Sequence, residues 1–158
     1  MSWFTTTLAG KLLSTFFVSM LPIVELRAGL PFGIGLGLNY YQALVVAVLG
    51  NMLPVPFIIL LIRKIFSLLR RINPWFEKKI SRLEQRAESK SGTVQKYGPI
   101  GLYILVAIPL PGTGAWMGSL VAAMMSLRLK KAVPAIFLGV LTAACIMTVL
   151  TYGAIKLI

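Results

Sequence analysis

Hydrophobic residues fill four long blocks of the chain, and two of these blocks are nearly uninterrupted. Gln42 to Ile62 and Ala132 to Tyr152 are both almost wholly apolar, and basic residues stand at one end of each. A helix needs about 20 consecutive apolar residues to cross the hydrocarbon core of a bilayer. The pattern therefore predicts transmembrane helices over residues 42–62 and 132–152.

The other two blocks, residues 5–38 and 97–127, are too long for one span and contain prolines. Proline removes a helix donor and biases the preceding residue away from the helical region. Broken backbone is tolerated at membrane depth only where protein or a water-filled cavity satisfies it. We therefore predict that each block is a re-entrant hairpin of two half-helices. The predicted breaks are at Pro22, Pro31, Pro109 and Pro111.

A polar, basic connector separates the two halves. Asn73 and Pro74 are typical of a helix start, so we predict an amphipathic helix over residues 74–91. Its apolar stripe is Phe76, Ile80, Leu83 and Ala87, and its basic face is Lys78, Arg82, Arg86 and Lys90. One interpretation is a helix that binds the anionic membrane surface through this basic face. The other is a connector whose apolar stripe packs on the protein itself.

The charges favour one orientation in the membrane. The net charge is +12, and the basic residues lie beside hydrophobic spans, which argues against a nucleic-acid partner. If both broken blocks re-enter, residues 63–96 and 128–131 share one face. The positive-inside rule makes that face cytoplasmic, so we predict a multi-pass protein of the inner membrane.

A weak repeat with an offset of 89 residues relates the two halves. Leu21-Pro22 corresponds to Leu110-Pro111, Gly29 to Gly118, Leu38 to Leu127, Ala43 to Ala132, and Leu49-Gly50 to Leu138-Gly139. A hairpin followed by one span leaves the second copy inverted, which is a recurrent architecture of transporters. We therefore predict one all-α integral membrane domain over residues 1–158, with two re-entrant hairpins, two transmembrane helices and an inverted repeat.

The composition excludes most enzyme chemistry. The chain has no histidine and no aspartate, and Cys145 is its single cysteine. The usual nucleophile–base pairs and metal-ligand sets need these residues. We expect no catalytic residues, no metal site and no cofactor.

Glu25 and Arg27 are the exceptional charges, because they lie inside the first hydrophobic block. A charge near the bilayer centre costs about 2.5–3.5 kcal/mol on insertion scales, so it normally faces protein or water. Two residues apart, the two side chains point to different sides of a regular helix and pair poorly. One interpretation makes Glu25 a proton-coupling carboxylate and Arg27 an anion-binding cation. The other makes them a structural ion bridge or an interface anchor.

The second break, "PLPGTGAW", offers a counterpart at Pro109–Trp116. Gly112 and Gly114 permit unusual backbone angles, and Thr113 adds a hydroxyl. Amides at the start of the following half-helix would form an anion cradle with Arg27, so we predict that Gly112, Thr113 and Gly114 bind substrate. The alternative is a simple hairpin turn.

Other residues in these blocks have structural interpretations. We expect Trp116 to fill space and Asn51 to hydrogen-bond between helices. Glycines and alanine at a spacing of four predict close packing of the hairpin arms or a dimer contact. They are Gly29, Gly33 and Gly37 in the first half, and Gly114, Gly118 and Ala122 in the second.

The motifs "ELRAGLPFG" and "PLPGTGAW", with a basic middle between them, resemble the small multi-drug export protein family of bacteria and archaea. That family is distantly similar to the DedA and VTT-domain membrane proteins. The resemblance implies two re-entrant hairpins and movement of lipids, including polyprenyl phosphate carriers, across the bilayer. Glu25 and Arg27 would correspond to the charged tip of the first hairpin. The second hairpin of DedA-type proteins carries arginine, whereas residues 109–116 carry no charge here.

Three functions fit these observations. The first is a transporter or flippase, coupled to protons through Glu25, for an anionic lipid-linked phosphate. The second is a proton-coupled exporter of small cationic drugs, although Arg27 would repel a cation. The third is a non-transporting membrane scaffold. We expect membrane lipids as partners, and a homodimer, because one copy offers little wall around a midplane cavity.

Overall fold

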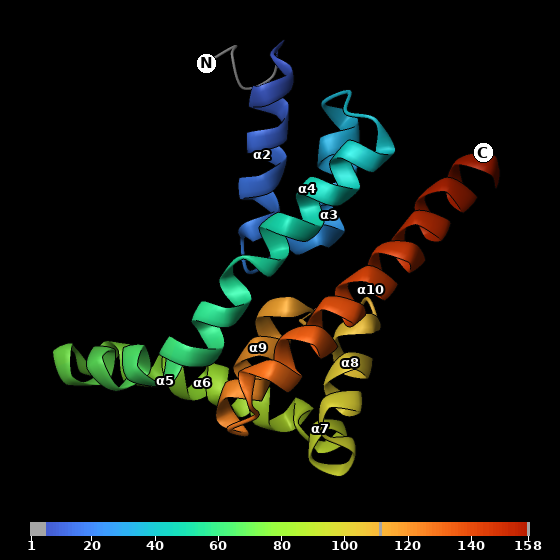
Figure 1. Ribbon diagram of the computed structural model, residues 1–158. Helices are drawn as coiled ribbons and strands as arrows, with labels where there is room; N and C mark the ends of the chain where they lie inside the picture. The colour runs from blue at the N-terminus through green and yellow to red at the C-terminus, as the bar shows by residue number, and fades with distance from the viewer. Residues whose placement is uncertain (1–5, 111, 158) are drawn as a thin grey trace.

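The computed structural model describes residues 6–110 and 112–157, and these residues form helices without strands (Figure 1). The helices are α2 (Leu8–Met20), α3 (Glu25–Gly35), α4 (Tyr40–Met52), α5 (Pro54–Ile72), α6 (Pro74–Lys90), α7 (Gly92–Tyr97), α8 (Pro99–Ala107), α9 (Ala115–Met124) and α10 (Leu129–Leu157). The predicted all-helical fold is confirmed. The predicted break at Pro111 lies outside the described residues.

The first broken block folds as the helix pair α2 and α3. Gly29 lies against Ser19, and a Cβ on Gly33 would come within 2.8 Å of Thr15 Cγ2, so the arms are antiparallel and closely packed. The predicted packing role of these two glycines is confirmed. Pro22 lies in the turn between the helices, as predicted.

The predicted break at Pro31 is wrong, because Pro31 lies inside α3. Proline costs a helix one hydrogen bond and some crowding with the preceding turn. A helix packed in a membrane protein tolerates this cost when neighbouring helices hold it in place. Here α2 and α4 both pack on α3.

The two long apolar helices are long enough to span a membrane. One runs from Tyr40 to Ile72 through α4 and α5, and the other from Leu129 to Leu150 within α10. The first exceeds the predicted bounds at both ends, and the second begins three residues before the predicted start and ends two residues before the predicted end. The first continues past Arg63 and Lys64 because charged side chains are good helix formers and end only the apolar segment. α4 and α10 run in opposite directions (Figure 1).

The second broken block contains α8 and α9, and the described residues between them, 108–110 and 112–114, are not helical. Pro109 lies in this break, as predicted. Gly118 of α9 faces Val106 of α8, where a Cβ would come within 2.5 Å of the valine side chain. Whether either helix pair re-enters a membrane stays a prediction.

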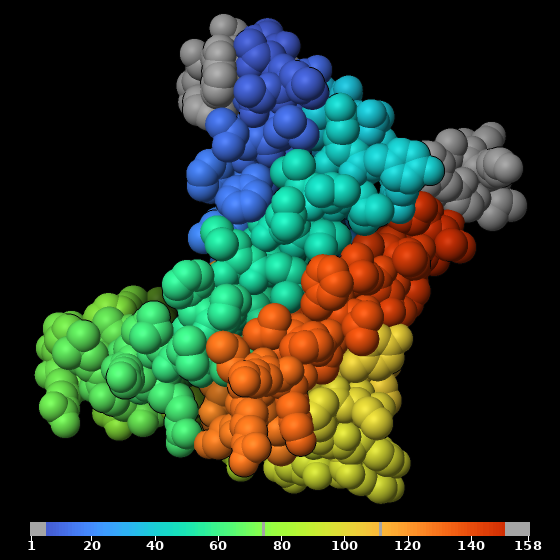
Figure 2. Space-filling model, in the orientation of Figure 1, coloured from blue at the N-terminus to red at the C-terminus, as the bar shows by residue number. Residues whose placement is uncertain are grey.

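α6 spans nearly the predicted residues, and the Asn73 side chain caps it by accepting from the Trp75 N–H at 2.9 Å. The helix packs on α5 and α9. Ile80 and Ala87 of its apolar stripe are buried. The apolar stripe thus packs on the protein, which favours the connector interpretation over a stripe that enters lipid. In Figure 2 the end of α5 and α6 project from the body of the molecule.

The offset of 89 residues also relates local structure in the two halves. Leu38 N–H donates to Gly33 O at 3.1 Å, and Leu127 N–H donates to Ala122 O at 2.9 Å. These are the long bonds of two Schellman motifs, which end α3 and α9. The residues in the left-handed position, Gly37 and Ser126, have φ of 84° and 54°. Both spans then begin in register, with Ala43 N–H bonded to Asn39 O and Ala132 N–H bonded to Arg128 O.

Candidate functional site

Glu25 begins α3 and reaches across to α9. Its Oε1 accepts a hydrogen bond from the Trp116 N–H at 3.1 Å. The side chain is only 5% exposed, and its backbone has a φ of 49°, which is rare outside glycine. Amides in the first turn of a helix carry the positive end of its dipole, so α9 stabilises the buried carboxylate.

Arg27 contacts the break between α8 and α9, on the side of α8. Its Nη2 donates to Thr113 Oγ1 at 2.8 Å and to Ile108 O at 3.3 Å, and its Nη1 donates to Leu110 O. Ile108 is the C-cap of α8. The carbonyls at a helix C-terminus carry the negative end of the dipole, so they suit a cation.

Glu25 and Arg27 of the first hairpin therefore contact different half-helices of the second hairpin. The carboxylate of Glu25 binds the start of α9, and the guanidinium of Arg27 binds carbonyls at the end of α8 and beyond it. Within residues 6–110 and 112–157 the ion pair is Arg70–Glu84, so Glu25 and Arg27 form no salt bridge with each other. A third link joins Trp116 Nε1 to Met20 O at 3.0 Å. We call Glu25, Arg27, Thr113 and Trp116 the tip cluster.

Gly114 makes the close approach of Glu25 possible. Its φ of 121° and ψ of −168° fall in a region that is essentially restricted to glycine. A Cβ at this position would overlap the Glu25 carboxylate. Gly112 also has a positive φ, of 73°. In this conformation the backbone N–H that binds an anionic group is that of Trp116, and the anionic group is the Glu25 carboxylate.

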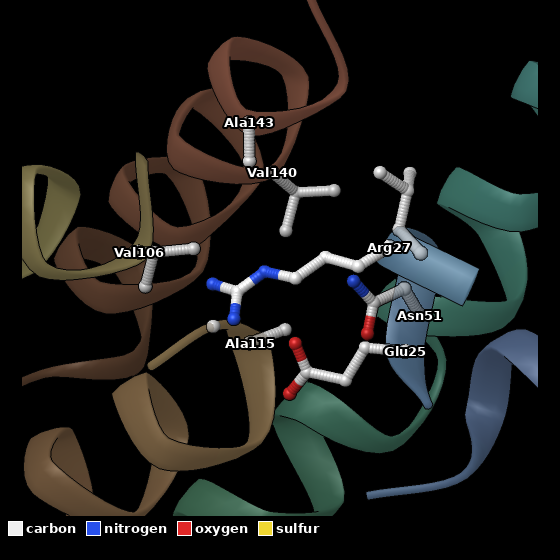
Figure 3. Close-up of a pocket in the computed structure, with 9 residues that line it drawn as sticks. Glu25, Arg27, Asn51, Val106, Ala115, Val140 and Ala143 are labelled. Carbon is white, nitrogen blue, oxygen red and sulfur yellow. The ribbon is translucent and has the colours of Figure 1, made fainter. Parts of the chain in front are cut away.

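A small cavity lies behind the tip cluster (Figure 3). Its volume is about 10 Å³, and Glu25, Arg27 and Asn51 line it together with apolar residues of α8 and α10. Asn51 is 2% exposed, and its Oδ1 has no hydrogen-bond partner among the described residues. The expected bond from this oxygen to another helix is therefore absent, and the expectation is wrong for this atom.

A larger cavity of about 820 Å³ opens on the other side of the tip cluster, between both breaks and helices α5, α6 and α9. Its wall is mainly apolar, with Ile58, Phe66 and Leu120 among the lining side chains. All four residues of the tip cluster line it, and so do Pro22, Pro109 and Gly112. The structure thus brings the predicted residues of the two breaks to one cavity. Gly114 lines the small cavity instead.

Among the charged residues of the larger cavity, Arg86 was not predicted to belong to the site. Arg86 of α6 lines the cavity, whereas the sequence places it with Lys78, Arg82 and Lys90 on a membrane-binding face. Trp116, for which we favoured space-filling over a place in the cavity wall, lines the cavity and bonds to the first hairpin. The spacing of four along α6 gives no signal that separates Arg86 from the other basic residues, because only tertiary packing distinguishes them.

Comparison with known proteins identifies the family. The family model described as "Putative small multi-drug export protein" matches residues 25–146, from Glu25 through the first apolar span and the second break into the second apolar span. No curated protein matches the chain. No solved structure matches it either. The similarity to DedA proteins stays a prediction. Because the match covers most of the chain, the protein belongs to the small multi-drug export family, a family of membrane export proteins and not a class of enzymes.

Proposed function

We propose that the protein is a transporter for an amphipathic anion of the lipid-linked phosphate class. The observation that carries this proposal is the composition of the larger cavity. Its wall is apolar over most of its area, while Arg27, Arg86 and Thr113 contribute hydrogen-bond donors to it. An apolar chain would fit against the wall, and a phosphate would lie between the two guanidinium groups.

The electrostatics of the cavity favour an anion. Two arginines face one carboxylate, and that carboxylate already accepts the Trp116 N–H. Arginine binds phosphate with two parallel hydrogen bonds, which are about twice as strong as bonds between neutral groups. Arg27 donates to neutral carbonyls in this conformation. A phosphate would therefore compete well for Arg27 and release the α8–α9 break from it.

Two re-entrant hairpins in an inverted repeat would give this cavity alternating access. Supporting observations are the matching Schellman motifs at an offset of 89 residues and the opposite directions of α4 and α10. In transporters with inverted repeats, substrate binds near the midplane where discontinuous helices meet. The bonds by which the tip cluster joins the two breaks support such a site. Movement of one hairpin against the other would have to open the bonds of this cluster.

Glu25 would couple protons to this movement. It is the one acidic residue outside α6 in the sequence, and its carboxylate joins the first hairpin to α9. Protonation would remove the charge that the amide of α9 stabilises. We place residues 63–96 and 128–131 on the cytoplasmic side of the inner membrane by charge bias. A homodimer would complete the wall of the cavity.

A second candidate is a proton-coupled exporter of cationic compounds. The observation that favours it is the Glu25 carboxylate in the wall of the larger cavity, where it could exchange a proton for a cation. Arg27 and Arg86 oppose it by repulsion. A membrane scaffold that docks partners through the exposed bases of α6 would need neither Glu25 nor Arg27.

Flux into proteoliposomes that hold a trapped pH indicator tests these alternatives. Wild type is compared with Glu25→Gln, Arg27→Gln and Arg86→Gln, and a polyprenyl phosphate or a cationic dye is added in separate trials. Arg82→Gln is the matched control, because Arg82 lies on the same helix but does not line the larger cavity.

We expect proton-linked flux with the phosphate, at least tenfold lower in the three cavity variants and unchanged in Arg82→Gln. Flux with the dye that needs Glu25 and survives the loss of Arg27 would establish the cation exporter instead. No flux with either compound, with a functional defect on removal of Lys78 and Arg82, would establish the scaffold.

A further inference from the structure

The buried oxygen of Asn51 has no role in the contacts described so far. Native proteins pair nearly all buried polar side-chain atoms, so an unpaired one calls for an explanation, such as a role in function. Among the described residues Asn51 Oδ1 is the atom of this kind. It lies in the apolar span that α4 begins.

The surroundings of Asn51 restrict that partner. The small cavity that Asn51 shares with Glu25 is about the size of one water molecule. Figure 3 shows Asn51 between Arg27 and Glu25, with its side-chain oxygen on the Glu25 side. The oxygen needs a hydrogen-bond donor. Arg27 lines the cavity too, but its Nη1 and Nη2 already donate to the α8–α9 break. The other lining residues are Leu26, Val106, Gly114, Ala115, Val140 and Ala143. None of these has a polar side chain.

We propose that Asn51 Oδ1 accepts the acid proton of Glu25 when Glu25 is protonated. A carboxylate has only acceptors, whereas a carboxylic acid has one O–H donor. A proton taken from water adds to the carboxylate, and the new O–H turns toward α4. This proposal rests on the proton coupling described under the proposed function. It adds that Asn51 is the hydrogen-bond partner that distinguishes protonated Glu25 from the carboxylate.

The two states of Glu25 then hold different elements. The carboxylate accepts the Trp116 N–H and ties α3 to α9. The acid donates to Asn51 and ties α3 to α4, within the first half of the chain. The charged groups near Glu25 are Arg27 of α3, in both cavities, and Arg86 of α6, in the larger one. Protonation leaves these two cations without a nearby counter-charge, so it also favours entry of an anionic substrate.

Infrared difference spectroscopy during acidification tests the proposal without a transport assay. The carbonyl stretch of a protonated carboxylic acid reports whether its O–H is hydrogen-bonded. In lipid-reconstituted wild type we expect an acid band that Glu25→Gln removes. In Asn51→Leu we expect the same band at higher wavenumber, because the O–H has lost its acceptor. Ser119→Ala is the matched control, since Ser119 is buried but bonds within its own helix to Ala115 O at 2.6 Å.

A second measurement follows the native Asn51 side chain, so it needs no substitution at that residue. Asparagine labelled with ¹³C at the side-chain carbonyl is incorporated into wild type and Glu25→Gln. We expect the Asn51 carbonyl band to move to lower wavenumber as Glu25 becomes protonated, and no movement in Glu25→Gln. Asn39 and Asn73 are exposed helix caps and contribute no such change.

An acid band at the same wavenumber in wild type and Asn51→Leu, or a labelled asparagine band that does not respond, would overturn the proposal. Neither result would bear on the transport proposal, which the flux measurement tests separately. Loss of flux with the infrared changes intact would contradict the transporter and leave the Asn51 contact standing.

Discussion

Replacement of Gly114 by alanine tests the contact between the two breaks. The backbone of Gly114 has a φ of 121° and a ψ of −168°, and a Cβ there would overlap the Glu25 carboxylate. A residue with a side chain in such a conformation costs about 1–3 kcal/mol. Displacement of Glu25 from the Trp116 N–H would cost a further 1.5–3 kcal/mol or so, because the hydrogen bond is charge-assisted. We therefore expect Gly114→Ala to lower the free energy of unfolding by about 3–6 kcal/mol.

The measurement is the thermal midpoint of the helical circular dichroism signal in detergent. For a chain of this size the expected loss corresponds to a midpoint lower by roughly 6–24 °C. Gly35→Ala is the matched control, because Gly35 ends α3 at the end away from the tip cluster and has no heavy atom within 4 Å of its added Cβ. Alanine is a better helix former than glycine by up to about 1 kcal/mol, so this control should be neutral or slightly stabilised.

Two results would refute this reasoning. Gly114→Ala with the thermal midpoint of wild type would mean that the Glu25 carboxylate does not lie against Gly114. If Gly114→Ala and Gly35→Ala lowered the thermal midpoint equally, the loss would be a general effect of replacing glycine by alanine. A rescue test follows from the same geometry: Glu25→Ala combined with Gly114→Ala should lose less stability than the two single losses predict together, since the overlap is then gone.

Three further predictions concern other contacts. Arg27→Lys should lower the thermal midpoint nearly as much as Arg27→Gln, because one ammonium cannot reproduce the planar fork that holds Thr113 and two carbonyls; a lysine variant with wild-type stability would contradict this. Gly50→Ala should destabilise the protein although alanine favours helices, because its Cβ would overlap the Phe16 carbonyl of α2; a stabilised variant would show that α2 and α4 are not in such contact. Glu84→Gln should cost at most about 1 kcal/mol, since the pair with Arg70 is exposed, and high salt should abolish the difference in thermal midpoint from wild type.

The elements that the sequence predicted best are those with strong local signals. The two apolar spans, the α6 cap at Asn73 and the turn at Pro22 follow from length, capping and proline chemistry, and the structure contains all of them. Pro31 shows the limit of such rules. A proline disfavours a helix locally, but packing of α3 on α2 and α4 overrides that preference.

The sequence identified several residues of the site, but it did not identify the contacts between them. Two charges and a proline-glycine break inside apolar blocks identify Glu25, Arg27 and Thr113, because each is costly at membrane depth unless satisfied. The partners of these residues lie more than 80 positions away in the sequence, so no spacing rule relates them. The role of Arg86 in the larger cavity depends on the packing of α6 on α5 and α9, which the sequence does not specify.

The central claim, that an amphipathic anion binds in the larger cavity at the tip cluster, is tested most directly by fluorescence of Trp116. Replacement of Trp3 and Trp75 by phenylalanine leaves Trp116, which lines that cavity, as the single tryptophan. A short polyprenyl phosphate and the matching uncharged polyprenol are titrated into this protein, into its Arg27→Gln variant and into its Arg82→Gln variant. The account predicts a saturable emission change with the phosphate, at least tenfold weaker binding of the alcohol, loss of phosphate binding in Arg27→Gln and wild-type binding in Arg82→Gln. Equal binding of phosphate and alcohol, or full binding without Arg27, would contradict it.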